Sequence, residues 1–196
     1  MPIEELESTA KLKEKMLFIK KFVTEPRTIG SVTPSSPQLV ASMLANVNWA
    51  QVRSVAEFGA GTGVMTREII KRKAPKCELM VFEIDNELRR QLSKETGLEI
   101  YDDATKICDT LTQKGIEKVD LIVSSLPYTV LPREVTKAVL DGIERTLDKN
   151  GTLVAFQYSL HMKCAFESLF HKVNIRFVMM NIPPAFVYEC KALRRG

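Results

Sequence analysis

The first residues that could do chemistry lie in the segment EFGAGTG, which begins at Glu57 and ends at Gly63. Its three glycines allow a tight turn and let a ligand approach the main chain. A dinucleotide-binding fingerprint needs glycine at position 64, where this chain has Val64, and no Gly-Lys-Ser/Thr follows to form a P-loop. Glu57 could hydrogen-bond an ammonium group or a water above the turn. The segment therefore favours a nucleoside that carries an amino acid over a dinucleotide.

Two acidic residues follow at later points where a strand is expected to end. Glu83, in FEID, could accept hydrogen bonds from both hydroxyls of an adenosine ribose. Asp103, in YDDA, could accept an adenine amino proton. Either residue alone could equally be a helix cap or a surface charge. Together with the glycine-rich turn they place three such features at three successive strand ends, and this favours a ligand site.

A fourth segment, SSLPY, could hold an amine. The Ser125 hydroxyl and the Leu126 carbonyl could accept its N–H bonds, while Pro127 stiffens the turn. The ring of Tyr128 could then face the cation that forms as a carbon atom is transferred. The competing interpretation is an ordinary strand-to-helix turn with Tyr128 in the core.

Short β-branched runs alternating with helical stretches are expected to position these residues. Strands are predicted at residues 54–58, 78–83, 98–101, 119–124, 152–157, 174–180 and 186–190. Helices are predicted at residues 37–47, 64–73, 87–95, 104–114, 133–147 and 161–170. The last two strands are joined by NIPP, which is too short for a parallel crossover, so they should form an antiparallel hairpin. The pattern predicts an α/β fold with a Rossmann-like, seven-stranded, mostly parallel sheet that ends in an antiparallel hairpin.

The first part of the chain has a different character. Residues 1–50 are predicted to form a helical cap and lid loop, and residues 51–196 the cofactor-binding domain. In residues 4–23 the apolar side chains share one helical face, with lysines around it. Residues 11–27 contain six basic and two acidic residues, an excess equal to the net charge of +4 of the whole chain. This helix could lie on an anionic membrane surface or simply cap the sheet.

Composition excludes several other classes of protein. With 45% hydrophobic and 27% charged residues, the chain has the composition of a globular domain. Its apolar runs are far shorter than the ~20 residues of a membrane span, and it lacks a secretory signal pattern. We expect a cytoplasmic protein, peripheral on the inner face of the membrane. The four cysteines are widely separated, so no metal site is expected.

Taken together, EFGAGTG, FEID, the Asp103-Ala104 pair and SSLPY resemble the successive motifs of class I S-adenosylmethionine-dependent methyltransferases. The resemblance covers the chain from about residue 52 to the end and implies S-adenosylmethionine as the cofactor. Ser31 and Thr33 would close over it. The remaining implied cofactor-binding residues are Glu57, Gly59, Ala60, Gly61, Gly63, Glu83, Ile84, Asp103, Ala104 and Ser124.

Two further segments, IGSVTPSS and NIPPAFVYECK, are similar to stretches of bacterial phospholipid N-methyltransferases, which act on phosphatidylethanolamine or related lipid amines. This resemblance implies a lipid amine substrate, with Ser125, Leu126, Pro127 and Tyr128 as catalytic residues and no dedicated general base. Ser125 stands where many nitrogen methyltransferases have Asp or Asn. The neutral serine accepts an amine N–H more weakly, which leaves open an atom other than nitrogen as the acceptor of the methyl group.

Three alternative functions remain. Ribosomal RNA adenine dimethylation is one, although those enzymes typically continue into a helical RNA-binding domain, which makes nucleic acid the weaker partner. The others are methylation of a small-molecule amine and non-catalytic binding of S-adenosylmethionine by a membrane-associated protein.

Overall fold

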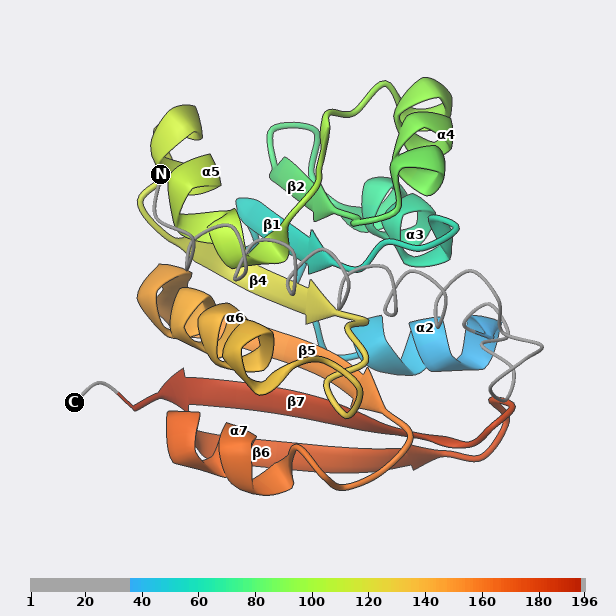
Figure 1. The fold of residues 1–196 in the computed structure, drawn as a ribbon, viewed down its shortest axis with the longest axis vertical. Helices are drawn as coiled ribbons and strands as arrows, with labels where there is room; N and C mark the ends of the chain where they lie inside the picture. The colour runs from blue at the N-terminus through green and yellow to red at the C-terminus, as the bar shows by residue number, and fades with distance from the viewer. Residues whose placement is uncertain (1–35, 195–196) are drawn as a thin grey trace, which may run out of the picture.

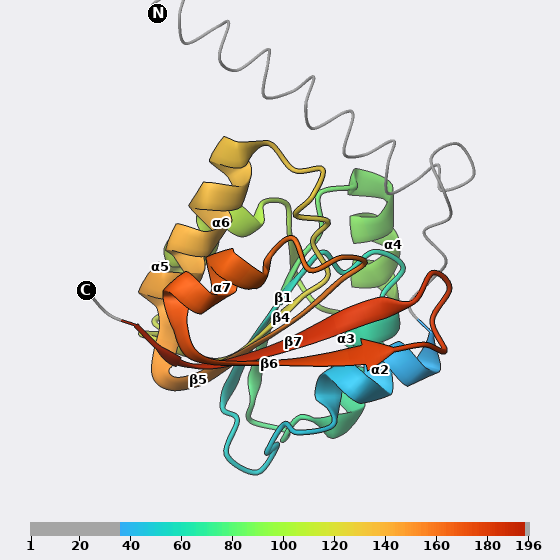
Figure 2. The ribbon, with the colours of Figure 1, turned by 90° about the horizontal axis from the view of Figure 1, so that it is seen from below.

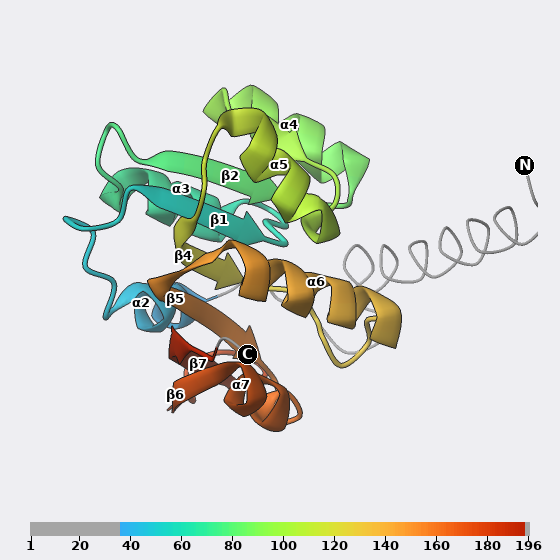
Figure 3. The same cartoon turned by 90° about the vertical axis from the view of Figure 1, so that its left-hand side faces the viewer.

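Seven strands form one sheet in the computed structural model, which describes residues 36–194. Their order is β3-β2-β1-β4-β5-β7-β6, and Figure 3 shows it from β2 at the top to β6 at the bottom. The strands are β1 (Ser54–Phe58), β2 (Glu78–Phe82), β3 (Ile100–Tyr101), β4 (Val119–Ser124), β5 (Leu147–Gln157), β6 (Phe170–Val178) and β7 (Ala185–Leu193).

The first five strands pair in parallel, whereas β7 lies antiparallel between β5 and β6. The predicted fold class is therefore confirmed, including the antiparallel last hairpin. Because β5 and β6 are both antiparallel to β7, they run in the same direction. Their carboxyl ends lie at the same edge as those of the other parallel strands (Figure 1).

Helices cover both faces of the sheet (Figure 2). One core lies beneath α5, α6 and α7 and includes Ile107, Ile143 and Phe166. The other lies beneath α2, α3 and α4 and includes Met43 and Ile69. The helices are α2 (Pro37–Leu44), α3 (Val64–Arg72), α4 (Asn86–Thr96), α5 (Ile107–Lys114), α6 (Arg133–Thr146) and α7 (Lys163–Leu169), and the short 3₁₀ helix η1 (Ala104–Lys106) precedes α5.

A buried carboxylate ties α2 to the hairpin. Glu189 Oε2 on β7 accepts hydrogen bonds from Arg176 Nη1 at 2.7 Å and Asn46 Nδ2 at 2.6 Å. Lys191 Nζ lies 2.7 Å from Glu189 Oε1, and Arg176 also donates to the Ser42 carbonyl. Burial raises the pKa of Glu189, but these hydrogen bonds outweigh it and hold the pKa at about 2. The cluster makes α2 part of the helical layer.

Most predicted elements are confirmed with small changes at their ends. β5 begins at Leu147, whereas the sequence predicted its start at residue 152, because the first residues, LDKNG, are typical of a polar turn. In the structure these residues join the sheet through an irregular register with β4. The predicted helix over residues 104–114 divides into η1 and α5.

The lysine-rich helix predicted at residues 4–23, and the rest of the cap before Ser36, lie outside the described residues. No helix among residues 36–194 is long and apolar enough to cross a bilayer.

Candidate active site

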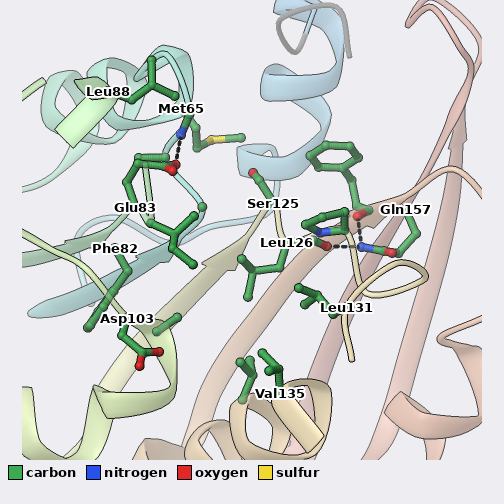
Figure 4. Close-up of a pocket in the computed structure, with 18 of the residues that line it drawn as sticks. Met65, Phe82, Glu83, Leu88, Asp103, Ser125, Leu126, Leu131, Val135 and Gln157 are labelled. Atoms are coloured by element: carbon green, nitrogen blue, oxygen red, sulfur yellow. Dashed lines mark hydrogen bonds between the residues drawn. The ribbon is translucent and has the colours of Figure 1, made fainter. Parts of the chain in front are cut away.

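A pocket of about 260 Å³ opens at the carboxyl ends of the parallel strands. Figure 4 shows its two sides: Glu83 and Asp103 lie on one, and Ser125, Leu126 and Gln157 lie on the other. The two sides come from different strands, β2 and β3 against β4 and β5. Strands that diverge beyond their ends leave such a crevice in doubly wound sheets.

The glycine-rich turn forms the wall between these sides. Gly59 N and Ala60 N both donate to the Phe82 carbonyl, at 2.8 and 3.1 Å, which fixes the turn to the end of β2. Gly59, with φ +78°, has the Leu126 side chain 3.2 Å from the place of a Cβ atom. A Cβ on Gly61, with φ +55°, would meet no atom within 4 Å. The main chain at Gly61 is therefore open to a ligand, as the sequence indicates.

Glu83 lies next to this turn, and the residue is 3% exposed. Its Oε2 accepts from Gly61 N at 2.6 Å and its Oε1 accepts from Asp85 N at 2.8 Å. Burial raises the pKa of Glu83, and these backbone donors lower it in part. Glu83 lines the pocket, and each oxygen of an ionised carboxylate can accept more than one hydrogen bond. The site thus offers two acceptors for a pair of hydroxyl groups.

Asp103 begins η1 and lines the same side of the pocket, together with Ile84 and Ala104. Its Oδ1 caps the helix by accepting from Thr105 N and Thr105 Oγ1, at 2.9 and 2.7 Å. Oδ2 lies 4.0 Å from Lys106 Nζ. Asp103 is therefore a helix cap, and its second oxygen stays available to a ligand. The role as a cap does not exclude the predicted role in ligand binding.

The opposite side carries the residues expected to hold an amine. Ser125, Leu126 and Pro127 line the pocket, and Ser125 N donates to the Phe58 carbonyl at 2.8 Å. The Leu126 carbonyl, however, already accepts from Gln157 Nε2 at 2.9 Å and from Tyr128 N at 3.0 Å. Both lone pairs of that carbonyl are occupied. In this arrangement Ser125 is the better placed of the two expected acceptors.

The structure places Tyr128 outside this pocket, away from the position expected for a residue beside a substrate. The residue is 3% exposed, lies in the core with its ring edge-on to Phe166, and is absent from the pocket lining. Its hydroxyl pairs with Ser124 Oγ at 3.0 Å, and Ser124 is itself fully buried outside the lining. Burial raises the pKa of Tyr128, so the phenol stays protonated. The core interpretation of Tyr128 is the one that this arrangement supports.

Glu57 and Gly63 also stay out of the pocket lining. A Cβ atom on Gly63, at φ +79°, would collide with Leu92 of α4, so this glycine serves close helix packing. Glu57 is fully buried in β1, and neither of its carboxylate oxygens has a hydrogen-bond partner among the described residues. Burial raises its pKa to about 8; nearby Thr66 lowers it in part and the charge of Glu83 raises it. Ser31 and Thr33 lie outside the described residues.

Sequence reasoning missed the contribution of the fifth strand. Phe156 and Gln157 end β5 and line the pocket, and Tyr158 and Ser159 extend the wall beyond them. The signal was available, because β5 is a predicted parallel strand and every carboxyl end of such strands faces the same crevice. Apolar side chains complete the lining beneath the amine side and beside the glycine-rich turn: Met65, Leu88, Leu131, Val135 and Val139. Among the described residues, no three His, Cys, Asp or Glu side chains gather as a metal site.

The sheet order, the open glycine-rich turn and the acidic acceptors at successive strand ends define a class of protein that binds a nucleoside cofactor at its crevice. The pocket fits S-adenosylmethionine: the carboxylate of Glu83 lines it, and a Cβ at Gly61 would meet no atom within 4 Å.

Comparison with known proteins identifies the class further. Residues 32–178 match the methyltransferase small domain family. The chain is 31% identical over 194 residues to an ornithine lipid N-methyltransferase of Singulisphaera acidiphila, covering 94% of this chain and all of the relative. A ribosomal RNA small subunit methyltransferase A of Thermotoga petrophila is 29% identical over 118 residues, 58% of this chain and 42% of that protein.

The N-methyltransferase NodS of Bradyrhizobium japonicum WM9, solved with S-adenosyl-L-homocysteine, has the same fold. Its TM-score is 0.62 at 15% identity, and the match covers 80% of this chain and 88% of NodS. This chain belongs to the methyltransferase small domain family and is an S-adenosylmethionine-dependent methyltransferase.

Proposed function

We propose that this protein transfers a methyl group from S-adenosylmethionine to the amine of a membrane lipid. The observation that carries the proposal is the match along the whole length of an ornithine lipid N-methyltransferase, which includes both sides of the pocket. Ornithine lipid and phosphatidylethanolamine both present a primary amine on a diacylated molecule, so either fits the proposal.

One side of the pocket holds the cofactor in this proposal. Glu83 accepts the ribose hydroxyls with its remaining lone pairs, and the main chain of Gly59, Ala60 and Gly61 lies against the amino-acid part. Asp103 Oδ2 accepts from the adenine amino group, with Ile84 and Ala104 beside the ring. The buried Glu57, ionised when a cation is near, supplies negative charge behind the turn. Ser31 and Thr33 stay proposed contacts from the lid loop.

The other side orients the amine. Ser125 lines the pocket, and its Oγ has no hydrogen bond to another described residue, so it is free to accept an N–H bond of the substrate. Gln157 and Pro127 hold the loop at Leu126, and the apolar wall receives the first carbons of the lipid. The cofactor supplies an electrophilic methyl group on a sulfonium. Proximity and orientation are the main contributions that such a displacement needs from the enzyme.

The amine must be neutral when it attacks. Among residues 36–194, no carboxylate or histidine stands on the amine side of the pocket, since the titratable groups of these residues in the lining are Glu83, Asp102, Asp103 and Tyr158. A proton therefore leaves through Ser125 or water, and we assign no general base. Because the pKa of a primary amine lies above neutral pH, the rate of methyl transfer should rise with pH until most of the lipid amine is in its neutral form.

The proposal is tested by offering the protein methyl-labelled S-adenosylmethionine with three substrates in parallel: vesicles that contain ornithine lipid or phosphatidylethanolamine, ribosomal RNA, and small amines. Label is expected in the lipid. The variant Ser125→Ala should lower turnover with the cofactor dissociation constant unchanged, while Ser168→Ala, on the exposed face of α7, should match the wild type. Label in RNA or small amines but not in lipid would refute the lipid substrate.

A further inference from the structure

Exposed apolar side chains of the described residues gather at one place. Seven large apolar residues are exposed among the described residues, and of these only Ile70, on α3, stands apart from that place. The other six come from the loop after β5 and from the end of β6 with the turn that follows it. We name these six the apolar rim: Tyr158, Leu160, Phe177, Met179, Met180 and Ile182.

The apolar rim borders the mouth of the pocket. The carboxyl ends of β5 and β6 lie at the same edge of the sheet, because both strands are antiparallel to β7. Tyr158 belongs both to the apolar rim and to the pocket lining. Figure 1 shows the β6–β7 turn on the side to which the arrowheads of β1, β4 and β5 point. A surface that met the rim would therefore meet the pocket.

The turn is held from inside while its apolar side chains face outward. Asn181 is 2% exposed; its Nδ2 donates to the Pro183 carbonyl at 2.7 Å, and its Oδ1 accepts from Ser36 N at 3.1 Å. On either side of it, Met180 is 70% exposed and Ile182 is 74% exposed. The braced turn presents these side chains in a defined direction, and the large exposed patch marks an interaction surface.

Charge points to an anionic partner. Both segments of the chain that carry the rim lack acidic residues, since residues 150–166 and 168–188 contain no Asp or Glu. Lys172 lies in the second segment, and Arg176 there is already paired with Glu189. The sequence carries six basic and two acidic residues between positions 11 and 27, and Ser36, at which the described residues begin, donates to Asn181 beside the rim. Apolar side chains next to basic charge are typical of surfaces that bind the interface of an anionic bilayer.

We propose that the apolar rim inserts into the headgroup region of an anionic lipid bilayer and sets the pocket mouth against it. A bilayer also explains the position of the rim, since a lipid amine could then reach Ser125 while its acyl chains stay in the membrane. The proposal rests on the lipid substrate proposed above, but the contact can be measured without turnover.

The test uses the full chain and vesicles of phosphatidylethanolamine and phosphatidylglycerol. The variant Met179→Ser/Met180→Ser/Ile182→Ser removes three rim side chains that touch neither pocket side, and Ile70→Ser is the matched control away from the rim. We expect the rim variant to co-sediment with vesicles at least about tenfold more weakly than the wild type. The control should bind vesicles as the wild type does, and both variants should keep the cofactor dissociation constant.

A second measurement places the rim directly and does not depend on the triple variant. The tryptophan fluorescence of Met180→Trp should be quenched by lipids with brominated acyl chains. The fluorescence of Ile70→Trp should be quenched no more than that of the wild type, whose native tryptophan is Trp49. Absence of quenching, or unchanged sedimentation of the rim variant, would overturn the proposal. So would a dimer that the rim variant converts to a monomer, because a second copy would then occupy the surface. Rim-dependent vesicle binding without label in any lipid would support the contact and refute the lipid substrate.

Discussion

Replacing Glu57 with glutamine should stabilise the protein at alkaline pH and weaken cofactor binding. Glutamine has nearly the same shape but never carries a charge. In the folded protein burial raises the pKa of Glu57 from its ordinary value of 4.5 to about 8. Between these values the unfolded chain has lost the proton that the folded chain retains. Stability therefore falls as pH rises from about 4.5 to 8, and it levels off above that.

The size of the effect follows from the same two values. At about 1.4 kcal/mol for each pKa unit, the difference between 4.5 and about 8 corresponds to at most about 5 kcal/mol. Glu57→Gln should thus match the wild type at pH 5 and exceed its free energy of unfolding by about 2 to 5 kcal/mol at pH 8.5.

Urea denaturation from pH 5 to 9 measures this difference, with Glu68→Gln on the exposed face of α3 as the control. The control should leave the pH dependence of stability between pH 6 and 9 unchanged. Under the proposed role of Glu57, its carboxyl ionises when the cationic cofactor binds, which glutamine cannot do, so S-adenosylmethionine should bind the variant about tenfold more weakly by calorimetry. Parallel stability curves for wild type and Glu57→Gln would refute the argument that this buried carboxyl is protonated in the folded state.

Three further changes test other parts of the structure. Gly63→Ala should destabilise the fold by about 2 to 4 kcal/mol, since it combines a left-handed backbone with a collision against Leu92. In thermal unfolding, Gly63→Ala/Leu92→Ala should lose less stability than the sum of the two single variants, because alanine at position 92 removes the collision. Gln157→Ala should lower kcat about tenfold in steady-state kinetics, with little change in cofactor affinity. The reason is that the variant loses the hydrogen bond to the Leu126 carbonyl, which holds the loop on the amine side of the pocket. The pKa of Glu189 is lowered from 4.5 to about 2, so its ionised carboxylate contributes about 3 kcal/mol to the free energy of unfolding above pH 4.5, and this is lost as pH falls toward 2. Glu189→Gln should remove this contribution, and urea denaturation at pH 7 and pH 3 would measure it.

The sequence predicted the sheet and one side of the pocket because those features depend on local patterns. Alternation of β-branched runs with amphipathic stretches identifies parallel strands and their crossover helices. Each strand end is then a known location for a ligand group, as for Gly59, Glu83 and Asp103. Short polar interruptions misled the prediction only at element boundaries, as at the start of β5.

The amine side was predicted less well because its residues depend on contacts across the fold. Leu126 was expected to offer its carbonyl to a substrate, but Gln157, from another strand, occupies it. Tyr128 follows Pro127 in sequence, yet the space beside Phe166 in the core decides where its ring lies. No spacing in the chain reports which of two neighbouring cavities a side chain will enter.

The sequence by itself therefore determined the class of fold, the cofactor and the strand ends at which the pocket opens, since these follow from periodicity and from motifs within a few residues. Only the tertiary structure decided that β7 lies between β5 and β6, which brings the β6–β7 turn to the mouth of the pocket. It also decided that Glu57 is buried without a hydrogen-bond partner among the described residues and that Met179, Met180 and Ile182 are exposed. Burial depends on how segments that are distant in the chain pack together, and it sets both the pKa of a carboxyl group and the apolar surface that stays exposed.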